Sequence, residues 1–149
     1  MKSLRLLFLS SVTALVLAAC GGGGGSSASA TGTWQGTLTN TANNATLDFV
    51  AKLTDNNGTI TGTLSGDIQI NVTGTRNGNN LTFGASDQSG SIQVSGTVNG
   101  NSFNGTFSLS ITGQGSASGS ATMTRTSTAT GFSSPNSSAS VQGFSRLLE

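Results

Sequence analysis

The chain has 149 residues, of which only 7% are charged, and its formal net charge at neutral pH is +1. With so little charge and no basic stripe, nucleic acid is not an expected partner. The chain has one cysteine and no histidine. No disulfide can form within it, and no metal or other cofactor is expected.

Residues 1–19 have the three parts of a secretory signal. Lys2 and Arg5 precede an uncharged, largely apolar stretch that ends in small residues before Cys20. The motif Leu17-Ala18-Ala19-Cys20 resembles the lipobox of bacterial lipoproteins. The resemblance implies cleavage before Cys20, a diacylglyceryl thioether on its sulfur and an acyl group such as palmitate on the new amine. Two or more chains of this kind hold a protein stably on a membrane.

The alternative for this segment is a transmembrane helix with a chance cysteine. A span needs roughly 20 apolar residues, whereas this run is shorter and is interrupted by Ser10, Ser11 and Thr13. We therefore expect a cell-envelope protein held by lipid on Cys20. By family analogy, Gly21 rather than Asp after the cysteine implies the outer membrane where the cell has two membranes.

Residues 20–31 follow as the lipidated cysteine and a Gly/Ser-rich tether. Such a sequence behaves as a flexible coil, and its ten residues from Gly21 to Ala30 have a root-mean-square reach of roughly 17 Å. The tether is expected to hold a domain away from the membrane without fixing its orientation.

Residues 32–126 alternate between apolar and polar side chains, which predicts half-buried β-strands. Turn sequences such as Asn77-Gly78 and Asn99-Gly100 separate eight such runs and suit tight hairpins. The sequence thus predicts an all-β domain, an eight-stranded antiparallel up-and-down β-barrel (a meander), with a β-sandwich as the alternative. The bulky side chains of the apolar face are Trp34, Leu38, Leu47, Phe49, Leu53, Ile60, Leu64, Ile68, Ile70, Val72, Leu81, Phe83, Ile92, Val94, Val98, Phe103, Phe107, Leu109, Ile111 and Met123.

Alternation alone does not say which face meets water, because a transmembrane barrel has the same period with its faces exchanged. Bilayer-spanning strands need about 9–11 residues, and most of these runs reach about 5–8 by the alternation count. The aromatic residues, one Trp and seven Phe, form no girdles. We therefore expect the Thr, Ser, Asn and Gln side chains to face solvent.

Residues 127–149 form a Ser-rich tail with a single proline. Its composition predicts a mostly disordered segment. The alternative is that Phe132, Phe144, Leu147 and Leu148 fold back over one end of the barrel.

The two ends of the domain suggest how it closes. Gly32-Thr33-Trp34 opens the first strand, and Arg125 lies on the apolar face of the last. If these strands pair, the Arg125 guanidinium can stack on the Trp34 indole. The pattern resembles the calycin barrels, which include lipocalins, avidins and fatty-acid-binding proteins. The resemblance implies a lumen for a small apolar ligand, lined here by Trp34, Phe49, Phe83, Phe107 and Arg125.

No catalytic group is expected, because no nucleophile–base pair, carboxylate dyad or metal-ligand cluster can be assembled from the sequence. Asp55, Asp67 and Asp87 occupy turn sequences, where Asp bonds the local backbone. Two hypotheses remain. The barrel is either a structural or interaction module that meets an envelope protein or polysaccharide, or a carrier of a small apolar or amphiphilic ligand. A barrel of eight strands is just wide enough for either.

Overall fold

The computed structural model of the protein describes residues 29–66, 69–128 and 140–149. The predictions for the signal segment, Cys20, Asp67, Ile68 and Phe132 concern residues outside these ranges. Within the ranges, no helix has the length and apolar character needed to cross a bilayer.

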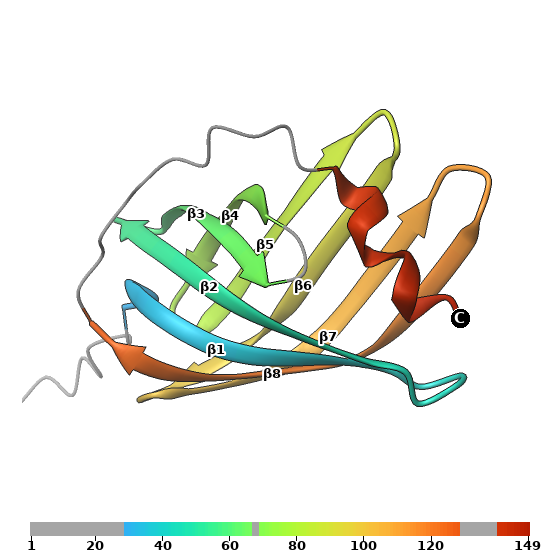
Figure 1. The fold of residues 1–149 in the computed structure, drawn as a ribbon. Coiled ribbons are helices and arrows are strands. Elements are labelled where there is room, and N and C mark those ends of the chain that lie inside the picture. Colours follow the sequence, from blue (N-terminus) through green and yellow to red (C-terminus); the bar gives the residue numbers. More distant parts are fainter. Residues whose placement is uncertain (1–28, 67–68, 129–139) are drawn as a thin grey trace, which may run out of the picture.

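Eight antiparallel strands form a closed barrel in which each strand pairs with its neighbours in sequence (Figure 1). The ring closes where β8 pairs with β1. The predicted meander is therefore confirmed, and the sandwich alternative is wrong. The strands are β1 Gly32–Asn40, β2 Thr46–Asn56, β3 Thr59–Gly66, β4 Gln69–Asn77, β5 Asn80–Asp87, β6 Gly90–Asn99, β7 Ser102–Ile111 and β8 Gly115–Ser127.

Six of the eight strands are longer than alternation suggests, at 9 to 13 residues, whereas β3 and β5 have 8. Counting alternation stops at the last apolar side chain, whereas backbone pairing continues through polar ends such as Ser116 and Ser118 of β8. Strand length therefore no longer helps to decide which face is wet, and burial has to decide it.

Burial places the apolar face inside the barrel. Trp34, Leu38, Leu53, Ile60 and Leu81 have no exposed surface at all, and the nineteen bulky members of the predicted apolar face that lie within the described residues are all buried. The outer face carries Thr, Ser, Asn and Gln side chains, most of them exposed. The predicted orientation of the two faces is confirmed.

Glycines within the strands lie where neighbouring backbones come close together. Gly96 of β6 is the partner of Gly105 of β7, and a Cβ on either would lie closer than 3.0 Å to the backbone of the other strand. Gly74 and Gly84 meet neighbouring backbone in the same way. These positions let a small barrel curve sharply.

The two ends of the barrel are covered by different parts of the chain. We call the end where β1 begins the tether end, and the end where β1 finishes the η1 end. Residues 29–31 lie over the tether end, and Ala30 is fully buried there. The sequence predicts a flexible tether as far as residue 31, whereas residues 29–31 are held against the barrel by their contacts with Asp55, Trp34 and Arg125.

At the η1 end, Val141–Leu147 forms a 3-10 helix, η1, that lies across the mouth of the barrel (Figure 1). It contacts β2, β5, β6 and β7. Phe144 and Leu147 are fully buried and Leu148 is half-buried. For residues 140–149 the tail is thus ordered against the barrel, as in the alternative prediction, because the barrel mouth offers apolar surface that composition does not reveal.

Candidate functional site

Trp34 and Arg125 meet at the tether end, where β1 and β8 close the ring. The two residues are partners in the β1–β8 ladder, and the guanidinium carbon lies 4.4 Å from the centre of the indole ring. The predicted stacking is therefore confirmed. Gly32, two residues earlier, has φ +143°, and a Cβ there would collide with the Ser127 carbonyl. A glycine is therefore needed two residues before Trp34, because no side chain fits against β8 at that position.

Polar contacts of Trp34 and Arg125 hold Ser29 and Ala30, which lead into β1, at the tether end. The Trp34 indole Nε1 donates to the Ala30 carbonyl at 2.9 Å, and Arg125 Nη2 donates to the Ser29 carbonyl. Among the described residues, Arg125 Nε is buried without a hydrogen-bond partner. Burial lowers the pKa of the guanidinium, and the indole face supplies the attraction that a hydrogen bond would otherwise give.

Asp55, near the end of β2, also lies at the tether end. Its carboxylate accepts hydrogen bonds from Ala30 N–H at 3.1 Å and Gly58 N–H at 2.9 Å, and it forms an ion pair with Arg76 Nε. The Asp55 backbone N–H donates to Thr31 Oγ1 at 2.9 Å. Desolvation raises the pKa of this carboxyl, but the hydrogen bonds and Arg76 outweigh it, so the pKa lies below its ordinary value. Asp55 therefore contacts both residues 30–31, which precede β1, and the turn between β2 and β3.

The other three residues named for a ligand, Phe49, Phe83 and Phe107, are at most 3% exposed and lie on the inner face. The Phe83 ring lies 6.4 Å from that of Phe103, at 53°. The Phe49 ring fills the space above Gly36, where a Cβ would meet it within 3.0 Å. The sequence pattern predicted that Gly36 and Phe103 lie on the inner face but gave neither a role in ligand binding. Together these side chains form packed core.

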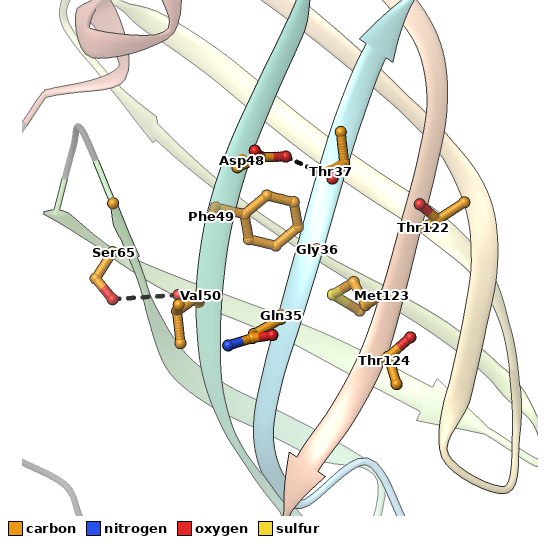
Figure 2. A pocket seen from close by; sticks show the side chains of 11 residues that line it. Gln35, Gly36, Thr37, Asp48, Phe49, Val50, Ser65, Thr122, Met123 and Thr124 are labelled. Atoms are coloured by element: carbon orange, nitrogen blue, oxygen red, sulfur yellow. Dashed lines mark hydrogen bonds between the residues drawn. The ribbon is translucent and has the colours of Figure 1, made fainter.

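A groove of about 560 Å³ lies over β1 where β2 and β8 flank it (Figure 2). Exposed Gln35, Asp48 and Thr124 line it, and Gly36 lies at its centre. Thr37 Oγ1 donates to Asp48 Oδ1 at 2.6 Å, so the one carboxylate in the lining is already engaged by a neighbouring strand. The groove offers hydroxyl and amide groups beside apolar surface from Phe49, Val50 and Met123.

At the η1 end, polar contacts hold the helix at both of its ends. Asp87, the last residue of β5, accepts from Val141 N–H at 2.9 Å, and the Ser89 and Ser140 hydroxyls share a hydrogen bond of 2.8 Å. Asn40 Nδ2 donates to the Leu147 carbonyl at 2.7 Å. The hydrogen bonds from Ser89 and Val141 lower the pKa of Asp87.

Sequence reasoning explained Asp55 and Asp87 by their turns alone. Each does bond its own turn, but each also bonds a segment far away in the chain, and no local signal reports that second partner. Within the described part of the chain, no three His, Cys, Asp or Glu side chains gather in a way that could hold a metal ion.

Comparison with known proteins found no matching protein-family model, curated protein or solved structure.

Proposed function

We propose that the protein is a lipid-anchored lipoprotein of the cell envelope, with a non-catalytic barrel that acts as a structural or interaction module. The anchor rests on the sequence of residues 1–20, in which charge, apolar length, small residues and Cys20 agree. Membrane attachment through lipid on Cys20 leaves the barrel free to meet other envelope components.

The observation that carries the module half of the proposal is the state of the barrel interior. Bulky apolar side chains are buried throughout it, and the chain covers both ends itself, with Ala30 at the tether end and Phe144 at the η1 end. An eight-stranded barrel can be filled in this way by its own side chains. The hydroxyl and amide groups of the outer face then provide the surface for a protein or polysaccharide partner.

The calycin-like carrier is the second candidate, favoured by the stacking of Arg125 on Trp34. A carrier needs room for its ligand between the buried aromatic residues that now pack together. Mass spectrometry of an apolar extract of the purified protein separates the two: a retained apolar molecule supports the carrier, and its absence supports the module.

The anchor is tested by Cys20→Ala in the producing cell. The variant lacks the sulfur that takes the diacylglyceryl group, so we expect precursor that keeps residues 1–19 and the loss of lipid mass from the protein. Ser26→Ala, outside the Leu17–Cys20 motif, is the matched control and should mature normally. Normal processing and membrane recovery of Cys20→Ala would contradict the proposal.

A further inference from the structure

The charged residues of the described ranges are segregated by sign along the barrel. Toward the tether end lie three cations and one carboxylate, namely Lys52, Arg76, Arg125 and Asp55. Toward the η1 end lie three carboxylates and one cation, namely Asp48, Asp87, Glu149 and Arg146. The formal charges of the described residues therefore leave the tether end net positive and the η1 end net negative.

The one carboxylate of the tether end does not cancel the exposed positive charge. The Asp55 side chain is 2% exposed and is paired with Arg76, whose side chain is 13% exposed. This pair is neutral and lies largely beneath the surface. The positive charge that remains for a partner at the tether end is that of Lys52 and Arg125.

Lys52 and Arg125 keep donors that no described residue uses. Lys52, on the outer face, is the partner of Thr33, the second residue of β1, and among the described residues its ammonium group has no hydrogen bond or ion pair. Arg125 gives Nη2 to the Ser29 carbonyl, while Nη1 bonds none of the described residues. Ammonium and guanidinium groups bind phosphate oxygens well.

The chain from Cys20 reaches the barrel at this same positive end. Residues 29–31 are held there by Asp55, Trp34 and Arg125. Lipid on Cys20 would therefore keep a bilayer close to Lys52 and Arg125. Proximity matters because attraction between exposed charges fades beyond about 8 Å at physiological salt. A short tether also converts a weak contact into an intramolecular one with a high effective concentration.

We propose that the tether end is a docking surface for a bilayer that contains anionic phospholipids, whose phosphate groups meet Lys52 and Arg125. The negative charge of the η1 end is repelled by the same bilayer, so the two ends favour one orientation. The inference rests on the proposed lipid anchor and gives the anchored barrel a preferred orientation. The sides of the barrel and its η1 end stay exposed to other envelope components.

The test uses residues 20–149, which include every described residue, coupled through the Cys20 thiol to a maleimide lipid in vesicles. Cys20 is the one cysteine of the chain and Trp34 the one tryptophan, so both the attachment point and the fluorescent donor are defined. Energy transfer from Trp34 to a dansyl-labelled headgroup lipid measures how close the tether end lies to the bilayer. The vesicles consist of phosphatidylcholine alone or of an equal mixture with anionic phosphatidylglycerol.

We expect greater energy transfer on the anionic vesicles at low salt. The difference should disappear at about 1 M salt, where the Debye length falls to about 3 Å. Lys52→Gln should lower the ratio of docked to undocked barrel about fivefold, the equivalent of the roughly 1 kcal/mol that one basic residue contributes near an anionic surface.

Arg146→Gln is the matched control, because it removes a cation from the opposite end and should not lower the energy transfer. Trp34 emission in the absence of dansyl lipid reports whether each variant keeps its buried indole. Equal transfer on the two kinds of vesicle at low salt, or an equal loss in Lys52→Gln and Arg146→Gln, would overturn the proposal. Since the coupling is chemical, either failure would leave the lipid anchor and its Cys20→Ala test unaffected.

Discussion

Arg125 shows how one side chain contributes to a closed sheet. Its guanidinium stacks on Trp34 and bonds the Ser29 carbonyl. Stacking of this kind is worth about 0.5–2 kcal/mol. We expect Arg125→Ala to lower the free energy of unfolding by about 2 kcal/mol, once the lost hydrogen bond is included. Urea titration followed by Trp34 emission measures the change.

Thr124→Ala is the matched control for Arg125→Ala, because Thr124 is the preceding residue of β8 and its side chain is exposed. It should change the free energy of unfolding by no more than about 0.5 kcal/mol. Equal stability of the two variants would show that the guanidinium adds nothing to closure of the ring.

At the residue scale, the sequence predicts pairs whose partners lie on one face of neighbouring strands. Trp34 and Arg125 could be paired because parity and closure together place them side by side. The distant partners of Asp55 could not be predicted, because its contact with the Gly58 amide is enough to explain an aspartate in a turn. Ala30 and Arg76 are 25 and 21 residues away from Asp55, and they come near only when the barrel has formed.

At the scale of strands, glycine decides how tightly the sheet can curve. Gly96 and Gly105 are partners, and neither position has room for a Cβ against the neighbouring backbone. Overpacking of this kind costs typically 1–3 kcal/mol. We expect Gly105→Ala to lower the free energy of unfolding by about that amount, measured by urea titration.

Thr106→Ala provides the comparison for Gly105→Ala, since Thr106 is the next residue of β7 and its side chain is exposed. Its stability should stay close to that of the native chain. A Gly105→Ala variant as stable as Thr106→Ala would mean that the two strands move apart at no cost.

Strands and η1 differ in how far they can be predicted. Each strand carries its signal in its own alternation, so all eight could be placed, although the polar ends of β8 were missed. η1 has a Ser- and Gly-containing sequence with three spaced apolar residues, which composition alone assigns to disorder. Its order comes from the mouth of a barrel whose strands lie elsewhere in the chain.

At the scale of the whole molecule, one carboxylate bonds a covering segment at each end of the barrel, Asp55 at the tether end and Asp87 at the η1 end. Both have a folded-state pKa below the ordinary value of 3.8. A carboxyl of lowered pKa stabilises the fold above its unfolded pKa, and this contribution is lost as the pH falls through the folded pKa. We therefore expect stability to hold above about pH 5 and to fall below about pH 4.

Urea titrations at several pH values check this expectation. Asp55→Asn should be less stable than the native chain at neutral pH, because Arg76 loses its ion-pair partner, and should show a shallower loss in acid. A native chain whose stability does not change between about pH 5 and pH 2.5 would contradict the role given to these two carboxylates.

The attachment of residues 29–31 to the tether end determines how the molecule is presented. Nine peptide steps separate Cys20 from Ser29, a leash of at most roughly 30 Å. With Cys20 lipidated as proposed, the barrel would be attached to the membrane through its tether end, where residues 29–31 are held. The tether end, with Trp34, would stay within roughly 30 Å of the bilayer surface, whereas the η1 end could move farther away from it.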